Sequence, residues 1–216
     1  MAQSRRRIPR LTRAKLPEAL ADLARADPDL RELTRLEVEL PPPRSRPDGF
    51  AGLIHIIVEQ QVSVAAGQSM IRSLREGVGE FTPENFLRFS PEQLRRFSLS
   101  GQKAGYCHGL AEAVAADVLD LDALPGLEDD AVRERLCGIK GIGRWSADIY
   151  LLGHLRRCDV MASGDLALQA AVQDIKNLPD RPDARQLDEI ALAWSPWRSV
   201  AARLLWQHYR NLRGTA

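Results

Sequence analysis

Apolar residues along this chain recur at the three- and four-residue spacing of α-helices. Strand signals are missing, since there is no sustained alternation of apolar and polar residues and no Asn-Gly hairpin. The most apolar stretch, FAGLIHIIVEQQV at 50–62, predicts a buried core helix. The pattern therefore predicts an all-α protein of about ten helices with short connections. The expected helices are 16–26, a second one from 28, 50–62, 64–78, 101–118, 128–136, 144–157, 165–177, 182–193 and 196–212.

Prolines mark several of the helix boundaries. The segment PPPRSRPDG at 41–49 predicts a break between helices. Thr82-Pro83 and Ser90-Pro91 each place a capping hydroxyl before a proline, which favours the first helical position. Ser90 and Gln93 also fit a capping box, so helices are expected to begin at both prolines.

Composition indicates a soluble globular protein, with 44% hydrophobic and 27% charged residues among 216. No apolar run approaches the roughly 20 residues of a membrane span, and the N-terminus lacks the apolar segment of a secretory signal. The three cysteines, Cys107, Cys137 and Cys158, are scattered and odd in number. We therefore expect a cytoplasmic protein in a reducing compartment, without a disulfide framework or a membrane partner.

The charge is unevenly distributed although the net value is only +1. Residues 1–15 hold six basic side chains and no acidic one, while the rest of the chain has 24 basic and 29 acidic residues. We expect a flexible basic tail at 1–15 and a folded domain at 16–216. The tail either grips phosphate in a salt-dependent way or is a solvated, frayed terminus. Binding of a polyanion by the folded part would require a local device, because its bulk charge is negative.

Such a device is predicted at LCGIKGIG, residues 136–143. Glycines allow positive φ and a close approach of another backbone, and the start of the following helix favours an anion. Apolar residues between the glycines would anchor the turn in the core and leave its amides exposed. The alternative is an ordinary helix–helix turn with a glycine cap. The residues expected to contact DNA phosphate are Gly138, Ile139, Lys140, Gly141, Ile142 and Gly143.

Asp165 follows Gly164 and precedes the apolar stretch LALQAAV. On its own it is typical of a simple helix N-cap.

Together, LCGIKGIGRWSA at 136–147 and the aspartate of SGDLALQ resemble a superfamily of DNA glycosylases. That superfamily is named for its helix-hairpin-helix element, its Gly/Pro-rich loop and its aspartate. The resemblance implies two helical lobes with a DNA-binding cleft between them, and Asp165 as the catalytic carboxylate. The usual hairpin proline is Lys140 here, which would add a phosphate contact.

The resemblance also implies a monovalent cation held by hairpin carbonyls, and no other cofactor. By position the ligands would be the carbonyls of Cys137, Ile139 and Ile142. No cysteine follows Cys158, so the iron–sulfur cluster of another branch of the superfamily is excluded.

A carboxylate suits the cleavage of an N-glycosidic bond. Positive charge builds on the sugar as the bond breaks, and a buried carboxylate stabilises it or orients the attacking water. Relatives that also cut the strand use a lysine two residues after the last hairpin glycine, where this chain has Trp145. We therefore expect a monofunctional enzyme without AP-lyase activity, in which water is the nucleophile.

Within the superfamily, the chain is most similar to the 3-methyladenine DNA glycosylase II branch over about residues 50–212. The similarity rests on IVEQQVSVAAG, LSGQKAGYCHGLA, the hairpin, SGDLALQ and SPWRSVAARLLW. Members of that branch carry an extra N-terminal β-domain. Only about 45 mostly helical residues precede the matched part here, so no separate β-domain is expected.

Base flipping requires a residue that fills the gap in the duplex and a pocket that holds the base. By position in the family pattern the wedge is Gln61, which alternatively is a surface residue at a helix end. Cationic alkylpurines are attracted to an indole face by about 0.5–2 kcal/mol. The expected pocket residues are Trp206, Trp145, Tyr150 and Asp148, while Trp194 and Trp197 are expected in the core.

These observations predict a monomeric glycosylase that excises alkylated bases from double-stranded DNA during base excision repair. The bases would be 3-methyladenine and related lesions such as 7-methylguanine, 1-methyladenine or 3-methylcytosine. Two alternatives stay open: a non-catalytic helix-hairpin-helix module that only binds DNA, and a glycosylase for deaminated, oxidised or mismatched bases.

Overall fold

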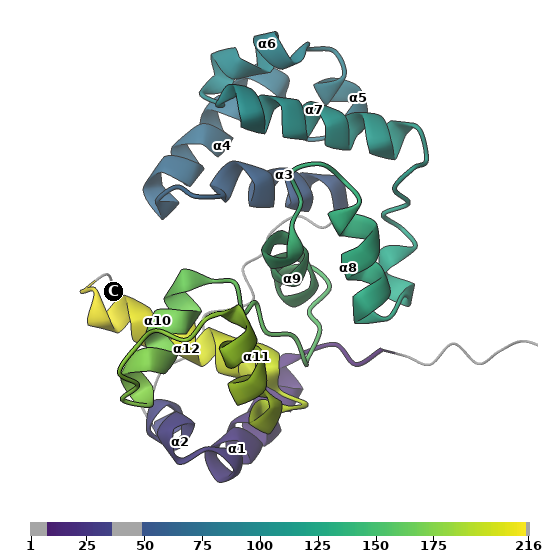
Figure 1. Ribbon diagram of the computed structural model, residues 1–216. Helices are drawn as coiled ribbons and strands as arrows, with labels where there is room; N and C mark the ends of the chain where they lie inside the picture. Colours follow the sequence, from purple (N-terminus) through teal and green to yellow (C-terminus); the bar gives the residue numbers. More distant parts are fainter. Residues whose placement is uncertain (1–7, 36–48, 215–216) are drawn as a thin grey trace, which may run out of the picture. The chain divides into compact units, whose positions relative to one another are not determined.

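A computed structural model describes residues 8–35 and 49–214 of the protein (Figure 1). Across these residues the chain forms twelve α-helices, four short 3-10 helices and no β-strand. A single isolated bridge, between Arg10 and Arg157, is the one strand-like pairing in this part of the chain. The all-α fold class predicted from the sequence is therefore confirmed. The helices belong to two compact units, which are described in turn.

The described part of unit 1 comprises residues 49–150. Its central helix is α3, which packs against α4 and α7, while α5 and α6 lie along α7 (Figure 1). The helices of this unit are α3 (Gly49–Glu59), α4 (Val64–Val78), α5 (Pro83–Phe86), α6 (Pro91–Leu94), α7 (Gly101–Ala115), α8 (Asp129–Cys137) and most of α9 (Arg144–Gly153).

Helix α3 is buried because nearly all of its side chains are apolar. Phe50, at its start, meets the edge of the Phe86 ring at a centroid distance of 5.3 Å. Phe81 packs against the same ring at 5.5 Å. Burying each of these aromatic and aliphatic side chains stabilises the fold by roughly 1.5–3 kcal/mol. This core sets the position of the turn that follows α3.

Helices begin at Pro83 and Pro91, as predicted. The Thr82 side chain accepts a hydrogen bond from the Asn85 amide, and Pro83 occupies the first turn of α5. Ser90 and Gln93 form the expected capping box at α6. Each cap satisfies an amide that the helix itself leaves unpaired, which contributes roughly 1 kcal/mol.

The described part of unit 2 comprises residues 8–35 and 151–214, so it is built from segments on both sides of unit 1 in the sequence. Its most extensive helix pairs are α10 with α12 and α1 with α2, and α2 also packs against α12. Its helices are η1 (Arg13–Lys15), α1 (Leu16–Ala26), α2 (Pro28–Arg35), α10 (Leu166–Ile175), α11 (Ala184–Ala191) and α12 (Arg198–Leu212).

Asp27, between α1 and α2, joins the N-terminal and C-terminal parts of unit 2. It accepts a hydrogen bond from the indole of the buried Trp194 at 2.8 Å and pairs with Lys176 at 2.8 Å. Burial would raise the pKa of Asp27, but the hydrogen bonds from Lys176 and Trp194 outweigh it and lower the pKa below its usual value. The indole of Trp197 likewise donates a hydrogen bond to the Asp22 carboxylate at 2.8 Å. The expectation that both tryptophans are core residues is confirmed.

Five predicted helices end earlier than the sequence pattern indicated. Helices α10 and α11 each end two residues early, and three other helices differ by three or four residues. Helix α3 ends at Glu59 rather than residue 62, α7 at Ala115 rather than 118, and α9 at Gly153 rather than 157. In each of these three cases a non-glycine residue adopts left-handed backbone just beyond the helix. These residues are Gln61, Asp117 and Arg156, with φ of 54°, 55° and 55°. Left-handed backbone cannot continue a right-handed helix, and side-chain periodicity gives no sign of it.

The end of the predicted basic tail is ordered against unit 2. The Leu11 amide donates to the Arg156 carbonyl, and the Arg10 side chain donates to the Leu155 carbonyl at 3.2 Å. This differs from the flexible tail expected over 1–15. The first seven residues, and residues 41–48 of the expected break, lie outside the described part of the chain.

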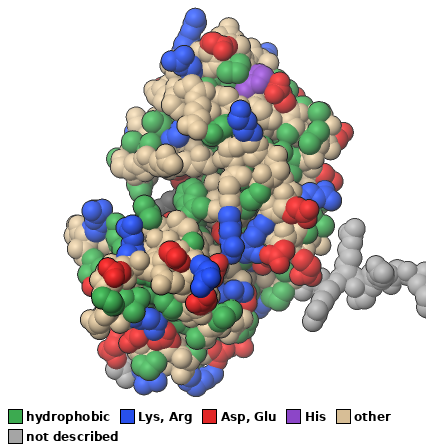
Figure 2. Space-filling model, viewed as in Figure 1, with side chains coloured by type: hydrophobic (Ala, Val, Ile, Leu, Met, Phe, Trp, Pro, Cys, Tyr) green, Lys and Arg blue, Asp and Glu red, His purple; other side chains and the backbone are tan. Residues whose placement is uncertain are grey.

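Charged side chains of both signs are interspersed on the face shown in Figure 2. No helix among the described residues is both long and apolar enough to cross a bilayer.

Candidate active site

The hairpin, residues 137–143, joins α8 to α9 in unit 1. Ile139 and Ile142 are 9% and 4% exposed, so they anchor the turn in the core. The Ile142 amide donates to the Ile139 carbonyl at 3.0 Å and closes the turn. Gly138, Lys140 and Gly143 lie on the exposed side. The turn therefore buries its apolar side chains, as predicted, and leaves Gly138, Lys140 and Gly143 exposed.

Only one of the three hairpin glycines is required by its surroundings. Gly141 has a φ of 95°, and a Cβ placed there would lie 2.2 Å from the Tyr106 ring. At Gly143 an added Cβ would meet nothing within 4 Å, and at Gly138 it would come no closer than 3.4 Å to a carbonyl. Gly141 thus fixes the turn, whereas Gly143 leaves open space at the start of α9, where helix amides favour an anion.

A groove of about 600 Å³ runs along the outer side of the hairpin within unit 1. It brings the predicted wedge and the predicted phosphate-binding turn together, because both Gln61 and hairpin residues line it. Gln61 is exposed in the tight turn between α3 and α4. The groove is lined by Gln60, Gln61, Val62, Met70, Ser100, Gln102, Lys103, Tyr106, Cys137, Ile139, Lys140, Gly141, Ile142 and Gly143.

Gln60 ties the α3–α4 turn to the hairpin. Its side-chain amide donates to the Gly141 carbonyl at 2.9 Å and to the Ser146 hydroxyl at 3.0 Å. These bonds cross 81 and 86 residues of sequence. The α3–α4 turn, which carries Gln61, is therefore joined directly to the hairpin.

The Lys103 side chain caps the C-terminal end of α3. Its ammonium donates to the Val58 carbonyl at 2.6 Å, where the helix dipole favours a positive charge. Partial burial lowers the pKa of Lys103 below its usual value. The groove thus has one basic group committed to a helix end, and a second, Lys140, that is exposed.

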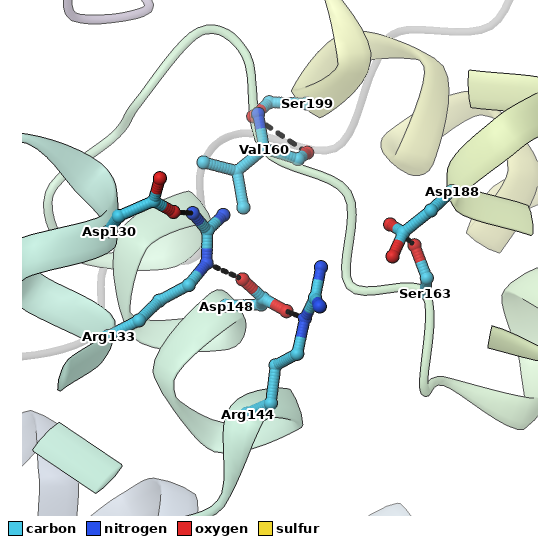
Figure 3. A network of polar contacts seen from close by, with 8 residues as sticks. All are labelled: Asp130, Arg133, Arg144, Asp148, Val160, Ser163, Asp188 and Ser199. Carbon is cyan, nitrogen blue, oxygen red and sulfur yellow. Dashed lines mark hydrogen bonds and ion pairs between the residues drawn. The ribbon is translucent and has the colours of Figure 1, made fainter. Parts of the chain in front are cut away.

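Asp148 is buried on α9 and engages two arginines (Figure 3). Arg133 donates to it at 2.7 Å, and Arg144 lies 3.6 Å away. Burial would lower the pKa of Arg133, but its bonds to Asp148 and Asp130 outweigh this and raise it. Asp148 therefore links α8 to α9 on either side of the hairpin, and its role in a base pocket stays a prediction.

Asp165 is the N-cap of α10 in unit 2. One carboxylate oxygen, Oδ1, accepts hydrogen bonds from the Ala167 and Leu168 amides at 2.9 and 3.2 Å. The carboxylate is half-buried. Asp165 is therefore an N-cap, and its position also suits the predicted catalytic role. An N-cap places a carboxylate at a fixed point on the positive end of a helix.

The segment that leads to Asp165, residues 158–165, is here named the aspartate loop. Its first half is fixed by Ser199, whose amide donates to the Cys158 carbonyl and whose hydroxyl bonds both the amide and the carbonyl of Val160. Its second half is fixed by Ser163, which donates to Asp188 of α11 at 2.5 Å (Figure 3).

The remaining pocket candidates differ in exposure. Trp145 on α9 and Trp206 on α12 are half-buried, whereas Tyr150 is 2% exposed. Trp145 and Tyr150 belong to unit 1, and Trp206 belongs to unit 2 with Asp165. A half-buried indole retains a face on which a base can stack, and a fully buried ring does not.

The helix-hairpin-helix and the capping aspartate both lie within a segment that matches a known family. The profile of the HhH-GPD superfamily of base excision DNA repair proteins matches residues 54–197. The chain belongs to this superfamily. The match includes the α3–α4 turn, the hairpin and the aspartate loop of this HhH-GPD protein.

Solved structures with the same fold include two glycosylases. The DNA-3-methyladenine glycosidase of Bacillus halodurans is 31% identical, with a TM-score of 0.76 over 92% of this chain and 91% of that one. The 3-methyladenine DNA glycosylase Mag1 of Schizosaccharomyces pombe, solved in complex with abasic DNA, is 26% identical. Its TM-score is 0.80 over 88% of this chain and 95% of that one.

A curated relative gives a similar result. The DNA-3-methyladenine glycosylase of Bacillus subtilis is 26% identical over 173 residues, which are 74% of this chain. The match covers 57% of that relative, so this HhH-GPD protein spans little more than half of its length.

Sequence reasoning missed several residues that hold the site. Gln60 lies beside the predicted wedge, but nothing in the pattern links it to Gly141. Tyr106 and Lys103 lie in the stretch LSGQKAGYCHGLA, whose similarity to the family does not indicate their contacts. Ser163 and Asp188 had no assigned role. All of them act through contacts between distant segments, for which a single sequence carries no signal.

Proposed function

We propose that this HhH-GPD protein is a monofunctional DNA glycosylase that flips alkylated bases out of double-stranded DNA and removes them by hydrolysis. The proposed substrates are 3-methyladenine and related lesions such as 7-methylguanine, 1-methyladenine or 3-methylcytosine. The observation that carries this proposal is the groove of unit 1. Its lining includes Gln61, an exposed residue with left-handed backbone, and the hairpin residues from Cys137 to Gly143 other than Gly138.

Each side of that groove suits one part of a damaged duplex. The open space at Gly143 and the first turn of α9 accommodate a backbone phosphate, which positions the protein without reading sequence. Gln61 can enter the stack and hydrogen-bond the base left without a partner. Because flipping costs a few kcal/mol and least for damaged bases, a wedge held rigidly by Gln60 would favour lesions.

The proposed chemistry rests on Asp165. Its carboxylate would stabilise the positive charge that develops on the deoxyribose and orient the attacking water. The half-buried Trp145 and Trp206 are the proposed stacking surfaces for a cationic base. The similarity to DNA-3-methyladenine glycosylases supports alkylated bases over oxidised or mismatched ones.

The experiment that tests this function is a base-release panel. Purified protein is incubated with duplexes that carry 3-methyladenine, 7-methylguanine, 1-methyladenine, 3-methylcytosine, hypoxanthine or ethenoadenine, and free bases are quantified. We expect release of at least 3-methyladenine by the wild type and little by Asp165→Asn. Binding without release of any base would favour the DNA-binding module, and release of hypoxanthine alone would favour the deaminated-base glycosylase.

The absence of lyase chemistry is a separate part of the proposal. Trp145 stands where a Schiff-base lysine would be needed. Borohydride reduction during turnover should therefore trap no covalent protein–DNA complex, whereas a lyase relative treated in parallel gives one. A trapped complex would contradict the monofunctional assignment and leave the glycosylase assignment intact.

A monovalent cation at the hairpin is also proposed. The carbonyls of Cys137, Ile139 and Ile142 are neutral oxygen donors, which suit Na⁺ or K⁺. The Ile139 carbonyl already accepts the Ile142 amide, but a carbonyl has a second lone pair. A bound cation would add positive charge beside the phosphate, without taking part in the chemical step.

A further inference from the structure

The Ser163–Asp188 hydrogen bond stands out among the polar contacts of unit 2. Ser163 is 1% exposed, and its hydroxyl donates to the Asp188 carboxylate at 2.5 Å. Hydrogen bonds of a hydroxyl to an ionised carboxylate are short and about twice as strong as neutral ones. The bond joins the aspartate loop to α11, an element that carries none of the residues proposed for catalysis (Figure 3).

The backbone of Ser163 is fixed as well as its side chain. Its carbonyl accepts a hydrogen bond from the side-chain amide of Gln169, which is 6% exposed on α10, at 2.8 Å. The next residue but one, Asp165, donates its amide to the Ala162 carbonyl at 2.8 Å. Ser163 is therefore held from α11 and from α10 at once, two residues before the proposed catalytic carboxylate.

Between Ser163 and Asp165 lies Gly164, which is exposed and adds no side-chain anchor. The Asp165 carboxylate is attached to the first turn of α10 through the Ala167 and Leu168 amides. The path of the backbone into α10 therefore determines where this carboxylate lies. Ser163 is the nearest preceding residue whose side-chain contacts fix that path.

From this arrangement we infer that Ser163 is a positioning residue for Asp165, with the Asp188 carboxylate as its anchor. The inference rests on the proposed glycosylase function. Without the Ser163 bond the loop would still fold on its Ser199 and Gln169 contacts, but the carboxylate would sample more positions. A displacement of about 1 Å at a reacting group can reduce a rate on the order of 100-fold.

The test compares single-turnover base release with DNA binding for Ser163→Ala, Asp188→Ala and Asp188→Asn. Ser163→Ala and Asp188→Ala should each lower the rate of release by roughly 10- to 100-fold and leave the affinity for abasic duplex within about twofold. Asp188→Asn keeps an acceptor oxygen and should recover most of the rate. The double Ala variant should be no slower than Asp188→Ala, since that substitution already removes the Ser163–Asp188 bond.

Two further variants separate positioning from general stability. Ser90→Ala removes an exposed helix cap in unit 1 and should lower the melting temperature without changing the rate. Ser163→Ala in an Asp165→Asn background should cause no further loss, because the group to be positioned is already gone.

The outcomes distinguish the two proposals. An active wild type with Ser163→Ala within twofold of its rate would overturn the positioning role alone. A further loss in the Asp165→Asn background would also overturn it, since Ser163 would then act without Asp165. A wild type that releases no base from any duplex of the panel would overturn the glycosylase function, and the positioning role with it.

Discussion

The hairpin of unit 1 and the aspartate loop of unit 2 are held by opposite means. The hairpin depends on apolar anchors and on a backbone shape that only Gly141 satisfies. The aspartate loop depends on side-chain hydrogen bonds from Ser163 and Ser199. A surface that binds phosphate through backbone amides needs a fixed backbone and little else. A group that acts on a bond needs its side chain fixed, so it requires polar partners from several elements.

The largest expected effect is that of a substitution at Asp165, in the aspartate loop. Asp165→Asn keeps the N-cap, because Asn caps helices as well as Asp, and should leave the melting temperature nearly unchanged. Base release should fall by about 10²–10⁴-fold because the carboxylate is lost. Single-turnover release and thermal unfolding measure the two effects. Asp183→Asn, at the cap of α11, is the matched control and should retain full activity. A wild-type rate for Asp165→Asn would remove it from the chemistry.

At the hairpin, the largest effect is expected from Gly141→Ala. The substitution combines left-handed backbone with a clash against the Tyr106 ring, which together should destabilise unit 1 by about 2–4 kcal/mol. DNA affinity should fall with it. Gly138→Ala, where the backbone is ordinary and space exists, is the control for denaturant unfolding and duplex binding. Equal stability of the two variants would show that the Gly141 conformation is not required.

The dependence of unit 2 on polar side chains extends to Asp27. Since its pKa is lowered in the folded protein, its carboxylate stabilises the fold above about pH 4, and this contribution is lost as the pH falls further. Asp27→Asn should cost about 1.5–3 kcal/mol at pH 7 and much less at pH 3. Urea unfolding at both pH values measures this, with the exposed Asp180→Asn as control. A pH-independent difference would contradict the assignment of charge to Asp27.

The smallest effect is expected at Lys140, which is exposed at the hairpin. Lys140→Ala should weaken duplex binding equally for all sequences and reduce the slope of log affinity against log salt by about one, since one phosphate contact is lost. Rates of base release at saturating protein should stay the same. An unchanged salt slope would show that Lys140 does not contact phosphate.

The sequence predicted the hairpin better than the aspartate loop, because the hairpin is held by local features and the loop by contacts between distant segments. Glycines and isoleucines at fixed spacing are local features, and so are the caps at Thr82 and Ser90, which the structure confirms. The ends of α3, α7 and α9 were misjudged because the left-handed backbone that follows each of them is not encoded in apolar spacing.

The contacts that hold the site were beyond the reach of a single sequence. Gln60 meets Gly141 across 81 residues, and Ser163 meets Asp188 across 25. Polar pairs at such separation produce no periodic signal, and each partner alone looks like an ordinary surface residue.

The discontinuous make-up of unit 2 has a consequence for how the protein is made. The described part of unit 1, residues 49–150, is continuous in sequence, so its core can form while synthesis proceeds. Helices α1 and α2 are synthesised before unit 1, yet their partner α12 is synthesised after it. The α2–α12 contact spans most of the chain and is slow to form, as for any contact of high sequence separation. The half of the protein that holds Asp165 is thus completed last, after the half that holds the hairpin.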